Sequence, residues 1–335
     1  MRVLVTGGAG YIGSVSVELL LQMGHDVTVL DDLSTGHRGA VPSRAHLEVG
    51  SYGSTDKVVA LLQKSKIEAV LHCASKAIVS DSMKDPGAYY SENVGGGLAL
   101  LEAMRTAKVR RMVFSSTAAV YGLPGKTPIT ETEPLRPTNA YGETKRVLES
   151  AIGWYGQAYG MRSVILRYFN AAGATMEHGE QHAPESHLIP SLLEAAAEGR
   201  PVTLFGDDYP TPDGTCIRDY IHVEDLAWAH IRGLEATAPT DARTGPQSGP
   251  CEPLICNLGN GRGFSNRQVV NAVEVVTRHS LGLKIGPRRA GDPPILIAAP
   301  DKARAKLEWK SRLGSLEDMI GSAWEWRQTH PSGYR

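Results

Sequence analysis

The chain has 335 residues, 41% of them hydrophobic, so one or two domains are expected. Its 35 basic and 36 acidic residues leave a formal charge of −1, so we expect no extended electrostatic field that would attract nucleic acid or an anionic membrane. Its four cysteines are too few for a disulfide framework, and because no histidines stand at zinc-site spacing from them we expect no bound metal. No secretory signal and no apolar stretch of the ~20 residues that cross a bilayer is present, so a cytoplasmic protein is expected.

Short β-branched apolar runs alternate with amphipathic stretches in the first half of the chain, which is typical of βαβ units around a parallel sheet. Strands and helices should therefore follow one another along this half. In chain order the pattern predicts strand 2–6, helix 14–23, strand 26–31, helix 55–64, strand 69–73, helix 88–107, strand 111–115, helix 141–159 and strand 162–168. The expected fold class is α/β, with a Rossmann-type doubly wound parallel sheet.

Beyond residue 168 the alternation gives way to loops rich in glycine and proline, such as 178–190, which is typical of a region that covers a substrate. The stretch 236–253 predicts an exposed loop before a strand at 255–258. The chain should therefore divide in two. The predicted parts are a nucleotide-binding Rossmann domain, residues 1–170 with returning segments near 216–258, and a smaller C-terminal substrate-binding domain, residues 171–215 and 259–335.

A glycine-rich turn follows the first predicted strand, with the sequence Thr6-Gly7-Gly8-Ala9-Gly10-Tyr11-Ile12-Gly13. Glycines suit a strand that turns sharply into a helix whose N–H groups face a pyrophosphate at close range. Such a triplet alone is a weak signal, because a tight turn without a ligand could use the same residues. The second strand strengthens it by ending in Asp31, whose carboxylate can accept hydrogen bonds from ribose hydroxyls and repel the extra phosphate of NADP. The sequence therefore predicts NAD as the cofactor.

Tyr141 and Lys145 stand four residues apart and so share one face of a predicted helix. A phenol with a pKa of about 10 is a poor base at neutral pH, and a nearby ammonium group would favour the phenolate. This spacing also arises by chance on surface helices. The fourth strand favours a catalytic interpretation, because it leads into Thr117, and strand carboxyl ends converge on the ligand in a doubly wound sheet.

Three features occur in this order along the chain: the glycine turn, the strand end at Ser115-Ser116-Thr117, and the pair Tyr141 and Lys145. Together they resemble the extended short-chain dehydrogenase/reductase family. Several longer segments are similar to the UDP-glucose 4-epimerases within that family, and the resemblance extends from near residue 3 to near residue 330. The matching segments are residues 167–173, 184–190, 206–215, 217–223 and 287–292.

The resemblance implies an NAD-dependent enzyme that inverts the C4 hydroxyl of a UDP-hexose and so interconverts UDP-galactose and UDP-glucose. Tyr141 would take the hydroxyl proton with Thr117 as a bridge, while the C4 hydride passes to nicotinamide and returns to the other face of a 4-keto sugar. Lys145 would also hold the nicotinamide ribose. A homodimer built on the helices at 88–107 and 141–159 is implied as well.

The resemblance also assigns binding residues, and guanidinium groups suit the UDP pyrophosphate because their forks match phosphate oxygens. The predicted cofactor-binding residues are Gly7, Gly10, Tyr11, Ile12, Gly13, Asp31, Asp32, Ser51, Lys145 and Tyr168. The predicted substrate-binding residues are Asn170, His187, Leu188, Arg218, Arg289, Asp292 and Leu296. Two of these residues have an alternative interpretation that involves no ligand. Asp32 could simply begin a loop, and Arg289 could be one of a solvated pair with Arg288.

Four positions depart from the family pattern. Ser51 replaces an acid that binds adenine, Lys76 stands one position early, and His187 stands where many relatives have asparagine. Leu296 occupies the wall position whose size helps to decide whether an N-acetyl group fits at C2, and leucine is of intermediate size. The same chemistry on a UDP-N-acetylhexosamine or another modified UDP sugar is therefore the alternative substrate prediction.

Other functions of the family fit the sequence less well. Dehydratases place an Asp-Glu pair after the strand-end threonine, and Ala118 and Ala119 cannot donate a proton there. A simple reductase needs no UDP clamp, which argues against it where Arg218 and Arg289 are present. A non-catalytic NAD sensor could lose the predicted catalytic residues. Tyr141, Thr117 and Lys145 are all present, which argues against a sensor.

Overall fold

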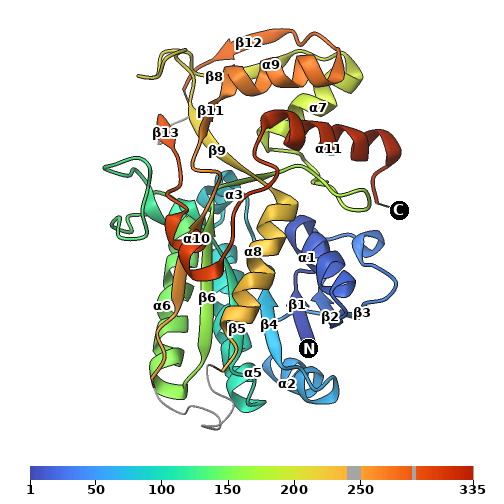
Figure 1. The fold of residues 1–335 in the computed structure, drawn as a ribbon, viewed down its shortest axis with the longest axis vertical. Helices are drawn as coiled ribbons and strands as arrows, with labels where there is room; N and C mark the ends of the chain where they lie inside the picture. The colour runs from blue at the N-terminus through green and yellow to red at the C-terminus, as the bar shows by residue number, and fades with distance from the viewer. Residues whose placement is uncertain (240–249, 289–291, 335) are drawn as a thin grey trace.

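A seven-stranded parallel sheet forms the centre of the larger lobe in the computed structural model, which describes residues 1–239, 250–288 and 292–334 (Figure 1). The strand order is β10-β6-β5-β4-β1-β2-β3. Its strands are β1 Arg2–Thr6, β2 Asp26–Asp31, β3 His46–Val49, β4 Ala69–His72, β5 Arg111–Thr117, β6 Arg162–Tyr168 and β10 Leu254–Leu258. The order reverses direction at β1 and β4, where ligands bind in doubly wound sheets.

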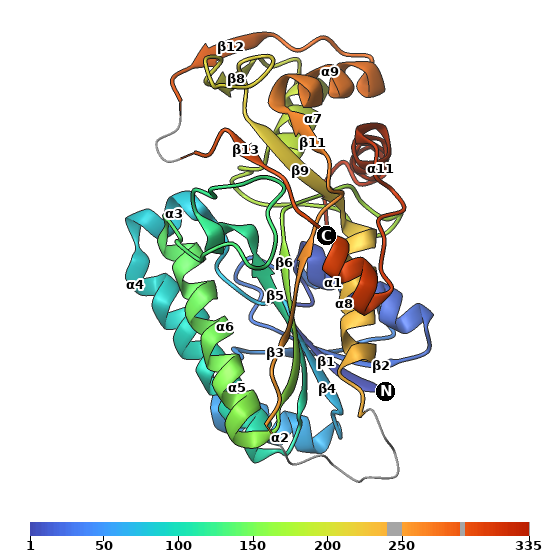
Figure 2. The same cartoon turned by 60° about the vertical axis from the view of Figure 1, so that its left-hand side comes forward.

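Helices cover both faces of this sheet, because its buried strands are apolar on both sides. Helices α1 (Tyr11–Gln22), α8 (Val223–Ala236) and α10 (Asp301–Leu307) pack on one face. The opposite face carries α2 (Thr55–Lys64), α5 (Gly97–Thr106) and α6 (Ala140–Tyr159), as Figure 2 shows. The expected α/β class with a doubly wound sheet is thus confirmed.

The smaller lobe lies beyond the carboxyl ends of the large sheet (Figure 1) and has its own apolar core. Two small sheets belong to it, ordered β11-β9-β13 with β7 beside β9, and β12-β8. Their strands are β7 Asn170–Ala172, β8 Val202–Phe205, β9 Ile217–His222, β11 Gly263–Ser265, β12 Leu283–Gly286 and β13 Ile295–Leu296. Its helices are α7 Leu188–Glu198, α9 Asn266–Thr277 and α11 Leu316–Thr329.

The chain returns to the large sheet through α8 and β10, whereas β9 pairs only within the smaller lobe among the described strands. The predicted division of the chain at residues 170, 215 and 258 therefore stays a prediction.

No helix among the described residues is long and apolar enough to cross a membrane.

The predicted helix 88–107 is in fact three consecutive pieces, which corrects its expected geometry. A short helix α4 (Pro86–Tyr89) leads into a π-helical segment η2 (Tyr90–Gly96), and α5 follows. Two glycines allow this part to approach its neighbours closely: an added Cβ would lie 2.8 Å from the Tyr52 ring at Gly96 and 2.6 Å from Leu148 at Gly97. The remaining short elements are α3 Val79–Lys84, η1 Arg38–Ala40 and η3 Ala118–Tyr121.

Candidate active site

The glycine turn joins β1 to α1 through tightly packed backbone. Gly7 has a φ of +70°, and an added Cβ there would lie 2.5 Å from the Ala74 nitrogen. At Gly13 an added Cβ would lie 2.0 Å from the carbonyl oxygen of Gly7. Both positions therefore require glycine for folding alone, whether or not a ligand binds.

Gly10 differs from the other two glycines because the protein itself does not require it. Its φ of −87° is open to any residue, and the nearest atom to an added Cβ is the Gly7 carbonyl oxygen at 3.4 Å. Gly10 also stands at the start of α1, where no side chain caps the helix and no acidic residue occupies the first turn. An uncapped helix start beside open space fits the close approach of a pyrophosphate.

Asp31 ends β2 with its side chain directed at this turn. Its two carboxylate oxygens accept from the backbone nitrogens of Ala9 and Leu33, each at 2.9 Å, and burial raises its pKa. Each oxygen keeps a further lone pair for a ribose hydroxyl. Asp32 is exposed and accepts from Ser34, and Ser51, also exposed, accepts from the Gly53 nitrogen at 3.1 Å.

The predicted catalytic residues meet at the carboxyl end of β5. Thr117 is the last residue of that strand, and Tyr141 and Lys145 lie on the first turns of α6. The Lys145 ammonium nitrogen donates to the Ser115 carbonyl at 2.9 Å and lies 5.9 Å from the centre of the Tyr141 ring. Tyr141 and Lys145 are 7% and 2% exposed, so water is largely excluded from both.

Burial dominates the acid–base properties of this pair in the protein alone. It raises the pKa of Tyr141 to about 12, although the neighbouring Thr117 hydroxyl acts in the opposite direction. Burial also lowers the pKa of Lys145 to about 8. The expected lowering of the Tyr141 pKa towards neutral pH is therefore not present in the protein by itself. The pKa of Lys145, in contrast, is lowered to a value not far above neutral pH.

Asn93 is a site residue that the sequence analysis missed. Its amide nitrogen donates to the Thr144 hydroxyl and to the Lys76 carbonyl, each at 3.0 Å, and its amide oxygen accepts from the Lys76 nitrogen at 2.8 Å. Asn93 thereby ties η2 to the helix turn that carries Tyr141 and Lys145. It also fixes the backbone of Lys76, whose side chain is exposed.

A buried ion pair anchors the next turn of α6. The Glu149 carboxylate accepts from Arg167 on β6 at 2.6 Å and from the Ser116 hydroxyl at 2.5 Å, with both charged side chains no more than 4% exposed. Arg167 also donates to the Tyr121 hydroxyl at 3.0 Å. These contacts connect α6, β5 and β6 directly below Tyr141 and Lys145.

Four of the predicted substrate residues lie together in the smaller lobe. Arg218 on β9 forms an ion pair with Asp292 at 2.6 Å, with side chains 12% and 34% exposed. The Asn170 amide donates to the Asp219 carbonyl at 3.2 Å, on the strand that carries Arg218. Leu296 is the register partner of Arg218 and packs against the apolar cluster that includes Ala118, the residue after Thr117.

The other predicted site residues have different surroundings. Tyr11 donates to the Gly173 carbonyl at 2.5 Å, and Ile12 packs on the core. Tyr168 ends β6, where burial raises its pKa well above the usual value. His187 precedes α7, and Leu188 begins it. Arg289 lies outside the described residues.

The residues at the turn fit NAD. Gly10 leaves space for a phosphate beside the uncapped start of α1, and Asp31 has free acceptor positions. Together with the buried Tyr141 and Lys145, this arrangement defines a nucleotide-dependent enzyme that moves a proton and a hydride. The chain matches the NAD dependent epimerase/dehydratase family over residues 3–244 and belongs to that family.

Individual relatives resemble the chain over its whole length. It is 46% identical to the UDP-glucose 4-epimerase of Lactobacillus helveticus, covering 100% of this chain and 99% of the relative. The UDP-glucose 4-epimerase of Halalkalibacterium halodurans is 47% identical, with coverage of 100% and 98%. The crystal structure of the Brucella ovis UDP-glucose 4-epimerase in complex with NAD has a TM-score of 0.90 at 43% identity, covering 96% of this chain and 97% of that one.

Proposed function

We propose that the protein is an NAD-dependent UDP-glucose 4-epimerase, which interconverts UDP-galactose and UDP-glucose. The observation that carries this proposal is the convergence of Tyr141, Thr117 and Lys145 at the carboxyl end of β5. Full-length similarity to proteins of that name supports the choice of sugar nucleotide. The cytoplasmic location expected from the sequence belongs to the same proposal.

Tyr141 moves the proton in the proposed reaction. Its phenol oxygen takes the proton of the sugar 4-hydroxyl, with Thr117 as the bridging hydroxyl. Because Thr117 already accepts from the Ala119 nitrogen at 3.1 Å, its own O–H remains available to donate. Bound NAD supplies the hydride acceptor and donor at C4. The Lys145 charge stabilises the phenolate through the low-dielectric interior.

The nucleotide half of the substrate is held by the smaller lobe in this proposal. Arg218 supplies a guanidinium fork for the diphosphate, and Asp292 both orients that fork and offers acceptors to ribose hydroxyls. Asn170 adds a neutral donor. Because these groups hold the nucleotide and leave the sugar free, the keto sugar can turn its other face to the hydride.

The deciding experiment incubates the purified protein with UDP-galactose, and separately with UDP-N-acetylgalactosamine, with and without added NAD. Products are followed by NMR. Conversion of UDP-galactose to UDP-glucose without net oxidation is the expected result. Faster conversion of the N-acetylated sugar would support the alternative substrate, and conversion of neither would contradict the proposal.

Gly10→Ala tests the cofactor role of the glycine turn. We expect an unchanged melting temperature, because the added Cβ has only one neighbour at 3.4 Å, and weaker NAD binding by about tenfold or more. Gly13→Ala should instead destabilise the fold, because its Cβ would lie 2.0 Å from a carbonyl oxygen. Calorimetry with NAD and thermal unfolding separate the two effects. Unchanged NAD affinity in Gly10→Ala would count against the predicted pyrophosphate position.

The proposed homodimer uses the outer face of α5 and α6, which lie side by side (Figure 2). Large apolar side chains are exposed on these helices, with Trp154 71% and Leu98 40% accessible. We expect Trp154→Glu to convert a dimeric mass to a monomeric one in light scattering. Val275→Glu, on α9, is the control because Val275 is equally exposed, at 73%. A monomeric wild-type protein would rule the proposal out.

A further inference from the structure

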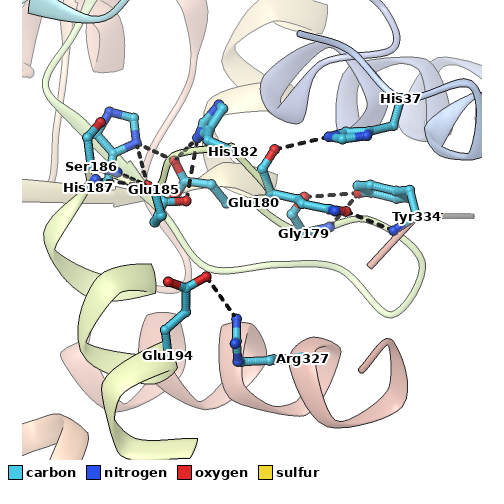
Figure 3. A network of polar contacts seen from close by, with 11 residues as sticks. His37, Gly179, Glu180, His182, Glu185, Ser186, His187, Glu194, Arg327 and Tyr334 are labelled. Atoms are coloured by element: carbon cyan, nitrogen blue, oxygen red, sulfur yellow. Dashed lines mark hydrogen bonds and ion pairs between the residues drawn. The ribbon is translucent and has the colours of Figure 1, made fainter. Parts of the chain in front are cut away.

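Two histidines and two glutamates converge in the segment before α7, apart from the catalytic residues (Figure 3). Glu180, His182, Glu185 and His187 each direct one oxygen or Nδ1 atom inward, and these four atoms all lie within 4.8 Å of one another. His187 was predicted only as a substrate residue, and the other three were not predicted, because a metal site was expected only where histidines stand at zinc-site spacing from cysteines. The spacing Glu-x-His-x-x-Glu-x-His was the available signal.

The separations between these atoms suit one small cation. His182 Nδ1 lies 3.3 Å from a Glu180 oxygen and 3.6 Å from a Glu185 oxygen, and His187 Nδ1 lies 3.9 Å from the other Glu185 oxygen. His187 Nδ1 also contacts Glu180 directly. Ligands held tetrahedrally at 2.0–2.2 Å from zinc are about 3.3–3.6 Å apart. Small side-chain rotations would therefore bring all four to one ion.

Among the described residues, no lysine or arginine balances the charge of the two glutamates. The Glu180 and Glu185 side chains are only 7% and 5% exposed, and no lysine or arginine in the described ranges forms an ion pair with either. His182 Nδ1 is buried and has no hydrogen bond of acceptable geometry, although it faces both carboxylates. Two buried carboxylates need two positive charges nearby.

That charge can come from two protonated imidazoles or from one divalent ion. A divalent ion satisfies the same carboxylates while each histidine offers a neutral nitrogen.

The segment that carries the cluster is held at both sides. The Gln181 carbonyl accepts from His37 at 3.2 Å, and its side chain accepts from the Tyr334 nitrogen at 2.8 Å. The Gly179 nitrogen donates to the Tyr334 hydroxyl at 2.8 Å. The backbone on either side of Glu180 is thus anchored, which reduces the entropy lost when an ion binds.

We propose that Glu180, His182, Glu185 and His187 form a binding site for a divalent transition-metal ion, with zinc as the best match to two imidazoles and two carboxylates. The ion would crosslink residues within the segment before α7. This segment contacts His37, which follows β2, and Tyr334 near the C-terminal end of the described chain. The proposal does not depend on the sugar substrate, because binding is measured without any nucleotide.

The test uses untagged full-length protein, stripped with a chelator, and then ZnCl2, CoCl2 or MgCl2 as probe. We expect about one zinc per chain by elemental analysis, and a melting temperature higher by roughly 2 °C or more at saturating zinc. Cobalt should give the visible absorption of a tetrahedral site. Magnesium should have no such effect at equal concentration, because it prefers octahedral oxygen ligands.

The double variant His182→Gln/Glu185→Gln should bind zinc at least roughly tenfold more weakly. His46→Gln is the matched control, since His46 forms an exposed pair with Glu48 at 3.7 Å and should bind zinc as the wild type does. Absence of zinc from the wild-type protein, or equal affinity in the double variant, would overturn the proposal. If the double variant does not fold, the stoichiometry and cobalt spectrum of the wild type decide.

Discussion

Tyr141→Phe should lower kcat for UDP-galactose conversion by about 10²–10⁴-fold, the usual contribution of a positioned acid–base group. The phenol lies beside Thr117 and Lys145, and phenylalanine keeps the ring that fills this buried position. NAD binding and folding should therefore be preserved. Turnover is measured by NMR, and bound NAD by absorbance after denaturation.

Tyr155→Phe is the matched control for that loss. Tyr155 stands on the same helix, but its hydroxyl donates outward to Glu102 at 3.3 Å, so turnover should stay close to that of the wild type. A Tyr141→Phe enzyme with wild-type turnover would contradict the proposed proton transfer. Loss of NAD together with activity would instead indicate a structural role for the hydroxyl.

Arg167→Met should destabilise the protein by about 3–5 kcal/mol, because it leaves the Glu149 carboxylate buried without its cation. The pair is at most 4% exposed, and Glu149 raises the pKa of Arg167 above its usual range despite burial. The free energy of unfolding in urea, followed by circular dichroism, measures the loss. Because α6 carries Tyr141 and Lys145, the proposed catalytic pair, turnover should fall as well.

Two comparisons separate burial of the charge from its mere presence. Arg105→Ala removes the solvent-exposed pair between Arg105 and Glu102 and should cost far less stability than Arg167→Met. The double variant Arg167→Met/Glu149→Leu should recover much of the stability lost in Arg167→Met, since apolar residues can replace a buried pair. A loss in Arg167→Met as small as that in Arg105→Ala would show that water reaches this pair.

The sequence predicted the large sheet well, because its buried strands read as short apolar runs with clear ends. The expected bounds of β1, β2 and β6 match the structure, and β5 runs two residues beyond its predicted end, to Thr117. The short strand β3 was not among the predicted strands, since its residues are mostly exposed and give no apolar run. The roles of the individual site residues stay predictions.

Some parts of the candidate site depend on contacts that no local pattern encodes. Asn93 acts through Thr144, which lies 51 positions later in the chain. Arg218 is oriented by Asp292, 74 positions away, and motif reasoning gave each a separate role. The raised pKa of Tyr141 follows from burial on all sides, whereas spacing alone suggested a shift in the other direction.

Because η2 is π-helical, the number of residues in this segment determines where Asn93 points. A π-helix turns through more residues per turn than an α-helix, because its hydrogen bonds close five positions apart. Removing one residue between Tyr90 and Gly96 would allow the same stretch to run as a regular α-helix into α5. Asn93 would then face a different direction and lose Thr144, so a single deletion far from Tyr141 in sequence would loosen the helix on which Tyr141 stands.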